Sequence, residues 1–177
     1  MTHDSQAIRA MFEGNPHPSI LFDANGRAID CNPAALAMIE ASDKESRLRD
    51  INANRYEAVP EFQPDGHRSR PFSENIRQTL EKGHSAFETN LTLSGRQVPF
   101  HVICKRAAYG ASFAVVACLT DLSRIRAAEA QIRQQSRLLQ VINQVAVSLT
   151  RAAPRAFDAA VRDAMDMIGR AADVDRL

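Results

Sequence analysis

Three cysteines, five histidines and a scattered set of carboxylates are the residues of this 177-residue chain that are able to carry chemistry. The cysteines are Cys31, Cys104 and Cys118, an odd number, far apart and all within strand-like stretches. This arrangement favours neither a disulfide framework nor a zinc site. Because a free cysteine usually behaves as a small hydrophobic residue, we expect all three to be core residues.

The histidines and carboxylates form no catalytic pattern. No Gly-x-Ser-x-Gly elbow, phosphate-binding glycine loop or His-Glu-x-x-His sequence occurs. The carboxylates Asp43, Glu45, Glu57 and Glu61 are spread through a polar stretch that is expected to be solvated. We therefore expect the chain to be no enzyme and to hold no metal.

Composition excludes several other classes. Lys and Arg number 22 against 21 Asp and Glu, so a nucleic acid or an anionic membrane is not an expected partner. No apolar run approaches membrane-spanning length, and the first ten residues lack the basic-then-apolar order of a secretory signal. A content of 45% hydrophobic residues is enough for a packed core. We expect a cytoplasmic globular protein.

The stretch FDANGRAIDCNPAA, residues 22–35, predicts a corner between a hairpin and a helix. Asn25-Gly26 is expected to supply the two positive-φ residues of a tight two-residue turn between strands 19–23 and 27–31. Asn32 is a suitable N-cap residue, and Pro33 fits the first helical turn, where a missing N–H costs nothing. A short helix should therefore follow over 33–41.

The remaining pattern predicts a helix-covered antiparallel sheet. Phe72, Ile76 and Leu80 recur at four-residue spacing before Gly83, which predicts a helix over 71–82 with a left-handed end. A cap helix is expected at 5–14, short helical turns within 43–62, and strands at 87–93, 98–104 and 112–119. With the first hairpin this gives five antiparallel strands with helices on one face, an α+β fold.

Four stretches in this order resemble the PAS sensory domain: ILFDANGRAIDCNPAA, LEKGHSAFE, LSGRQVPFHV and VVACLTDLS. The resemblance covers roughly residues 8–123. It implies a sensor input module in which helices close a cavity over one sheet face and the last strand leads into a signalling helix. Some relatives hold haem, flavin or a metabolite in that cavity, and others are empty dimerisation modules. Asp121 and Ser123 match the family's Asp-x-Thr element, with Ser in place of Thr, and are expected to couple the sheet to the helix.

Neither haem nor flavin is favoured by the residues present. The flavin photoreceptors of this family carry a reactive cysteine after an asparagine on a later helix, whereas here Cys31 precedes Asn32. None of His67, His84 and His101 is placed to ligate haem. A small-molecule ligand is left open, with core packing as the alternative for the same side chains. The candidates are Met38, Ile51, Phe72, Ile76, Phe100, Val102 and Val115, with Tyr56 and, as a charge partner, Arg55.

Residues 124–150 contain no glycine or proline and predict a coiled-coil linker. Apolar residues alternate by three and four, and a polar Gln135 in the seam would fix register and parallel pairing. The alternative is a single amphipathic helix folded back on its own domain. The expected seam of a homodimer is Ile125, Ile132, Gln135, Leu139, Ile142 and Leu149, together with Ala128 and Ala146.

The last segment carries a second amphipathic pattern. LLQVINQVAVSLTRA followed by FDAAVRDAMDMIGRAADVDRL resembles the opening helices of a GAF domain. We expect a cap at 1–17, a PAS-like sensor at 18–122, a linker helix at 123–150 and a partial GAF-like segment at 151–177. The resemblance implies a signal-relay module of a histidine kinase or diguanylate cyclase, whose output domain belongs to the same polypeptide. The alternative is a ligand-free structural dimerisation module.

Overall fold

The protein is described here by a computed structural model, which describes residues 3–39, 43–54, 58–151, 153 and 157–173. The chain divides into two compact units, residues 1–123 and residues 124–177. Arg55 and Tyr56 lie outside the described residues.

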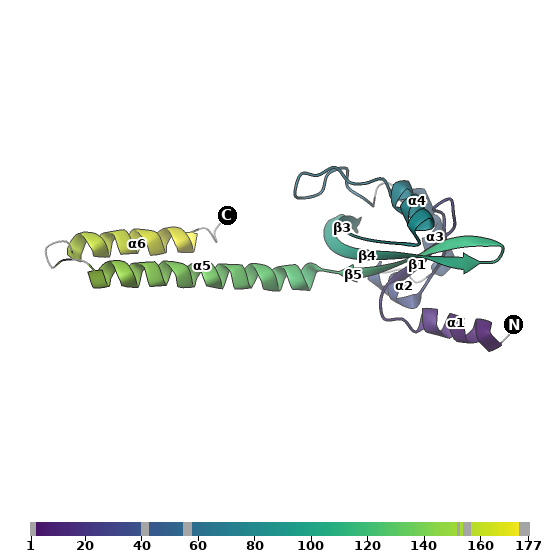
Figure 1. The fold of residues 1–177 in the computed structure, drawn as a ribbon, viewed down its shortest axis with the longest axis horizontal. Coiled ribbons are helices and arrows are strands. Elements are labelled where there is room, and N and C mark those ends of the chain that lie inside the picture. Colours follow the sequence, from purple (N-terminus) through teal and green to yellow (C-terminus); the bar gives the residue numbers. More distant parts are fainter. Residues whose placement is uncertain (1–2, 40–42, 55–57, 152, 154–156, 174–177) are drawn as a thin grey trace. The chain divides into compact units, whose positions relative to one another are not determined.

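A five-stranded sheet forms the first unit (Figure 1). The strand order is β2-β1-β5-β4-β3, and every neighbouring pair is antiparallel. The predicted class and strand number are therefore confirmed, although the last three strands are longer than the alternation indicated. The bounds are β1 Ser19–Phe22, β2 Ala28–Cys31, β3 His84–Leu93, β4 Arg96–Tyr109 and β5 Ser112–Asp121.

Three helices pack against the sheet, and together they contact all five strands. α2 contacts β1, α3 contacts β2, and α4 contacts β3, β4 and β5. α2 ends three residues before the predicted boundary, and the expected short turns within 43–62 are instead one eleven-residue helix, α3. Gly83 ends α4 with a φ of 84°, as predicted. The bounds are α1 His3–Glu13, α2 Pro33–Met38, α3 Lys44–Asn54 and α4 Phe72–Lys82.

The turn at Asn25-Gly26 differs from the prediction. Gly26 has a φ of 74°, but Asn25 is not among the described residues with positive φ. The Asp23 carboxylate explains the difference, because its Oδ1 accepts the backbone N–H groups of Asn25 at 2.9 Å and Arg27 at 2.8 Å. The chain therefore makes a longer loop. The tight turn with two positive-φ residues lies instead between β3 and β4, at Ser94 and Gly95, with φ values of 49° and 76°.

Asn32 joins the sheet to α2 and to the lead-in segment. Its Oδ1 accepts the N–H of Ala35 and the N–H of Ser19, both at 2.9 Å. Its Nδ2 donates to the carbonyl oxygens of Asn15 at 3.0 Å and His17 at 2.9 Å. The predicted N-cap is confirmed, and all four hydrogen bonds are made by a side chain that is fully buried.

Side chains from outside the sheet satisfy backbone groups at both edge strands. At β2, the Asn52 amide of α3 accepts the Ala28 N–H at 2.8 Å and donates to the Ala28 carbonyl at 3.0 Å. At β3, Gln63 Oε1 accepts the Asn90 N–H at 2.7 Å. Unpaired edge groups would otherwise be free to pair with another chain, so these contacts protect the sheet against edge-to-edge association.

The second unit contains two helices, α5 (Ser123–Arg151), of which residues 124–151 lie in this unit, and α6 (Phe157–Asp173). Both helices were predicted from the sequence, and no break interrupts α5. Val145 of α5 and Ala164 of α6 are buried. Within the described residues, no helix combines the length and the apolar character needed to cross a lipid bilayer.

Candidate functional site

The core between the sheet and the helices contains most of the residues predicted to line a ligand cavity. Ile76, Phe100, Val102 and Val115 are buried members of one hydrophobic cluster. Met38, Ile51 and Phe72 are partly buried and pack against that cluster. The structure therefore brings all seven described apolar candidates together.

A small polar cluster within this core was not anticipated from the sequence. Thr79 of α4 donates to the Asn75 carbonyl at 2.8 Å, and its hydroxyl lies 2.7 Å from the hydroxyl of Ser85 on β3. Ser85 is paired with Cys104 across the β3–β4 ladder. The signal that could have revealed Thr79 is its spacing of three from Ile76, which places it on the buried face of α4.

The two buried thiols, Cys31 and Cys104, are poor nucleophiles in this setting. Burial raises the pKa of the Cys104 thiol to about 11, and burial also raises the pKa of Cys31, against the opposing effect of nearby Lys44. Cys31 and Cys104 are buried, as predicted, whereas Cys118 is only partly buried. Because the thiolate is the reactive form, both buried thiols stay protonated and unreactive at neutral pH.

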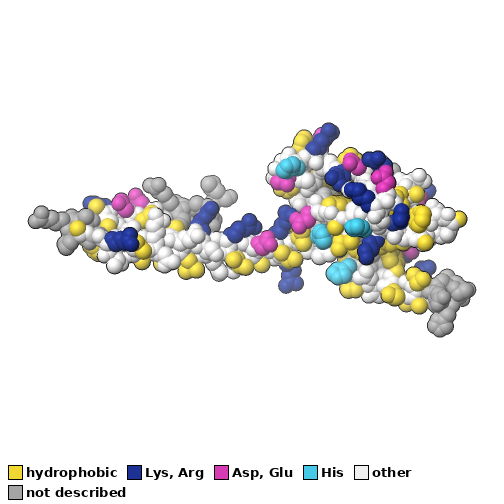
Figure 2. Space-filling model, in the orientation of Figure 1, with side chains coloured by type: hydrophobic (Ala, Val, Ile, Leu, Met, Phe, Trp, Pro, Cys, Tyr) yellow, Lys and Arg dark blue, Asp and Glu magenta, His cyan; other side chains and the backbone are white. Residues whose placement is uncertain are grey.

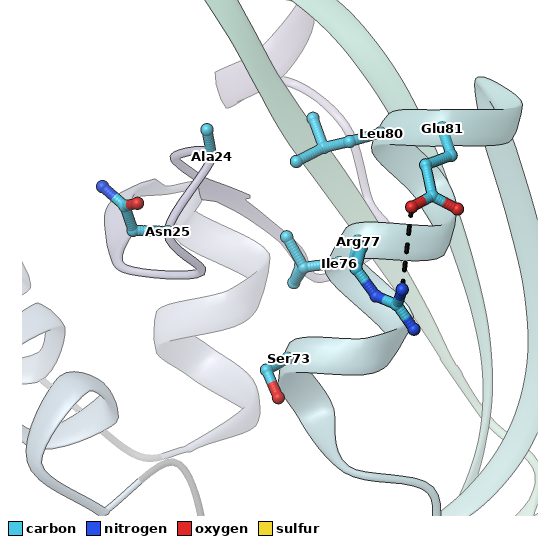
Figure 3. Close-up of a pocket in the computed structure, with 7 residues that line it drawn as sticks. All are labelled: Ala24, Asn25, Ser73, Ile76, Arg77, Leu80 and Glu81. Carbon is cyan, nitrogen blue, oxygen red and sulfur yellow. Dashed lines mark ion pairs between the residues drawn. The ribbon is translucent and has the colours of Figure 1, made fainter.

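A surface hollow of about 400 Å³ lies beside the first hairpin (Figure 3). Ala24 and Asn25 of the β1–β2 loop form one wall, and the side of α4 that faces this loop forms the other. In the close-up, Ile76 points toward the loop, while Arg77 is turned along the helix to Glu81, 3.8 Å away. Ile76 is the one predicted cavity residue among those lining the hollow, which are Ala24, Asn25, Ser73, Ile76, Arg77, Leu80 and Glu81.

The end of β5 is tied to the neighbouring strand and to the start of α5. Asp121 Oδ1 accepts the Ser123 N–H at 2.7 Å, and the Leu122 N–H donates to the Pro99 carbonyl at 2.9 Å. The backbone N–H groups of Leu122 and Ser123, which follow the sheet directly, therefore both have hydrogen-bond acceptors within the first unit. This geometry is compatible with the predicted contact of Asp121, but it leaves the role of the Ser123 hydroxyl as a prediction.

Comparisons with known proteins identify the fold. The PAS domain of an HTR-like protein from Haloarcula marismortui matches with a TM-score of 0.51 at 18% identity, covering 67% of this chain and 91% of that one. The PAS domain of BvgS from Bordetella pertussis matches with a TM-score of 0.50 at 15% identity, covering 76% of this chain and 98% of that one. The chain contains a PAS fold. The PAS domain of the fruit-fly ELK potassium channel, with a TM-score of 0.50 at 11% identity, covers 69% of this chain and 99% of that one.

No protein-family model and no curated protein matches the sequence. The first unit, residues 1–123, is the PAS unit of this chain. Because the identities are below 20%, its similarity to solved structures establishes its fold and not its ligand. Charges of both signs are interspersed on the visible face of the PAS unit (Figure 2), in keeping with the net charge of +1. Neither sign forms an extended patch on that face.

Removing the Asp121 carboxylate should loosen the first turn of α5 while leaving the PAS sheet intact. Asp121→Ala deletes the acceptor for the Ser123 N–H, a hydrogen bond that contributes about 1 kcal/mol. Hydrogen exchange should become faster in residues 122–128 and stay unchanged in β4 and β5. Asp43→Ala is a matched control, because Asp43 Oδ2 accepts the Ser46 N–H at the start of α3 and its loss should affect α3 alone. Unchanged exchange in residues 122–128 would rule out the coupling role.

The predicted seam of α5 is exposed along most of its length. Ile125, Ile132, Leu139 and Ile142 are between 51% and 62% exposed, and Gln135 is also exposed. Leu149 is partly buried. Large apolar side chains at this spacing on a solvent-exposed helix are typical of a surface that packs against another helix.

Proposed function

We propose that the PAS unit is the sensory module of a multidomain cytoplasmic signalling protein and relays its state through α5 to an output domain of the same polypeptide. The observation that carries this proposal is the direct connection of sheet and linker. β5 ends at Asp121, and two residues later a 29-residue helix begins that exposes an apolar stripe. A change in the core that shifts β5 would act on the start of α5 without an intervening flexible linker.

The relay requires two chains to be paired in parallel. Pairing removes the exposed seam from water, which contributes roughly 25 cal/mol per Å² of apolar area. A parallel dimer places identical sensors at one end and identical outputs at the other, so a rotation or register shift of α5 reaches both outputs together. Gln135 supports parallel pairing, because a polar residue in an apolar seam is best matched by its own copy.

Like charges at facing positions of the seam should convert the dimer to a monomer. Ile132→Asp with Leu139→Asp places like charges at facing positions of a parallel pair while the PAS core is untouched. Sedimentation should report a dimer for the wild type and a monomer for this variant. Ala130→Asp with Gln140→Asp adds the same charge at exposed positions on the opposite side of α5 and should stay dimeric. A monomeric wild type would overturn parallel pairing, as would a seam variant that remains dimeric.

We further propose that α6 and the end of α5 are the start of a GAF-like domain, and that the output is a histidine kinase or a diguanylate cyclase. This proposal is supported by the resemblance of the two helical segments and by the apolar side chains that α6 exposes, including Phe157 and Met165. The chain itself is proposed to be non-catalytic. It is expected to bind neither nucleic acid nor membrane.

The second candidate function is a ligand-free dimerisation module. It is favoured by the close packing of the predicted cavity residues, since Phe100 and Val115 are almost completely buried in the hydrophobic cluster. A sensor that binds a small molecule would release it on denaturation, and mass spectrometry of the released fraction distinguishes the two functions. In neither case is haem or flavin proposed, so the purified protein should show no visible absorbance band.

A further inference from the structure

The two helices of the second unit form an antiparallel hairpin. Only residues 152–156 connect α5 to α6, and Figure 1 shows α6 running back along α5. Among the described residues of this unit, Val145 on α5 and Ala164 on α6 are the least exposed, at 9% and 4%. Val145 therefore marks the side of α5 that faces α6, and Ala164 marks the side of α6 that faces α5.

Two exposed apolar residues stand in the same relation to these buried positions. Ile142 precedes Val145 by three residues, and Val161 precedes Ala164 by three residues. At 3.6 residues per turn, a residue three positions before another lies about 60° around the helix from it. Ile142 and Val161 are therefore displaced from the buried residues by the same angle and in the same sense, when each helix is viewed along its own chain direction. Because the helices run in opposite directions, the same sense on both brings Ile142 and Val161 to the same side of the hairpin.

Leu139 of α5 and the other exposed large apolar residues of α6 follow the same rule, whereas Val147 lies about 160° around α5 from Val145 in the other sense. This side of the hairpin is therefore the more apolar one. We call it the hairpin face and define it as Leu139, Ile142, Phe157, Val161, Met165 and Ile168, which are between 36% and 68% exposed. The same construction places Arg137, Gln144 and Asp163 on the opposite side. The unit is therefore two-sided, which is the pattern of one half of a four-helix bundle.

We propose that the hairpin face binds the hairpin face of a second copy of this chain, forming a parallel-paired dimer with a four-helix bundle at this end. This rests on the proposed parallel pairing of α5 and extends it to α6. A two-fold axis parallel to α5 places α5 of one copy opposite α6 of the other, with the two parallel α5 helices diagonally across the common core that the two apolar faces enclose.

Continuity and area both favour a second copy as the occupant. The hairpin face shares Leu139 and Ile142 with the α5 seam, so one apolar stripe runs from Ile125 into α6. Six side chains at about half exposure amount to roughly 300 Å² of apolar area per chain, taking about 100 Å² for each side chain. Ile125 and Ile132 of the seam add to this area, and a stable interface buries roughly 800 Å² per partner with its polar rim included.

The test places charges on the part of the hairpin face that belongs to α6. Val161→Lys with Met165→Lys should weaken the dimer at least tenfold in sedimentation equilibrium, with unchanged helix content by circular dichroism. Ala159→Lys with Asp163→Asn makes the same change in charge at exposed positions away from the hairpin face and should behave as wild type. Met165→Gln, at the most exposed of these positions, removes apolar surface without a new charge and should weaken the dimer several-fold.

The outcomes separate the two proposals. The wild type is expected to be a dimer. If its dissociation constant is unchanged both by Val161→Lys with Met165→Lys and by Met165→Gln, α6 lies outside the interface and the bundle is overturned, while the pairing of α5 stands. A monomeric wild type would overturn the pairing of α5 and the bundle with it. If the Lys variant loses helix content, the Met165→Gln variant decides between a bundle and an interface made by α5 alone.

Discussion

Replacing Phe100 by alanine should lower the free energy of unfolding by about 3 to 5 kcal/mol. Phe100 is 1% exposed and lies in β4, among the buried residues of the core cluster. The substitution removes a whole ring from a packed region, so the lost transfer free energy is added to the cost of the cavity left behind. Urea denaturation followed by circular dichroism gives this difference directly.

The size of that loss also tests the predicted ligand cavity. A ring that faces an existing void has fewer contacts to lose, so Phe100→Ala would cost less than about 2 kcal/mol if Phe100 lined an empty cavity. Phe113→Ala is the matched control on the adjacent strand. Phe113 is 51% exposed and contacts the Arg106 guanidinium at 4.9 Å from its ring centre, so about 1 kcal/mol is expected there. Equal losses at the two positions would contradict the packed core.

Replacing Asn32 by alanine should destabilise the PAS unit by about 3 kcal/mol, because it leaves the buried Ser19 N–H without its acceptor and removes three further hydrogen bonds. The side chain makes four hydrogen bonds, to backbone groups of the lead-in segment, β1 and α2. Buried donors and acceptors cannot be compensated by water as exposed groups can. Thermal or urea unfolding of the variant measures the loss.

Asn32→Asp separates the two halves of this hydrogen-bond set. The carboxylate keeps the acceptors for Ser19 and Ala35 but loses the donors to Asn15 and His17, and it buries a negative charge beside two carbonyl oxygens. A protonated carboxyl is able to donate again, so the deficit relative to wild type should shrink as the pH falls. Asn25→Ala, in the exposed part of the nearby loop, should change stability by less than about 0.5 kcal/mol. An Asn32→Ala variant as stable as Asn25→Ala would show that the hydrogen-bond set contributes little.

Local rules were sufficient where a residue acts on its immediate neighbours. Asn32 caps α2, Pro33 starts it and Gly83 ends α4, because capping and the left-handed conformation depend on a few adjacent backbone groups. Strand alternation gave the five strands and the antiparallel class. The absence of glycine and proline gave the unbroken helix α5.

The sequence pattern was misleading where a side-chain hydrogen bond to the backbone favoured a conformation other than the one that the local composition indicates. Asn25-Gly26 has the composition of a tight turn, but the Asp23 carboxylate two residues earlier favours a longer loop, and Ser94-Gly95 takes the tight turn instead. Helix α3 was missed because its apolar residues are few and its stabilising contact is distant. Its Asn52 amide pairs with β2, 24 residues earlier.

Only the tertiary structure decided how the predicted site residues are used. Periodicity showed that Ile76, Phe100, Val102 and Val115 face inward, but it cannot tell a cavity lining from a filled core, since both require the same apolar side chains. The structure packs them into one cluster and brings Thr79 and Ser85 together beside Cys104. On α5 and α6, likewise, the sequence determined which residues are apolar, whereas the antiparallel packing of the two helices decided that most of the exposed ones share one side. Burial depends on what lies across from a residue in space, and that is information no local spacing contains.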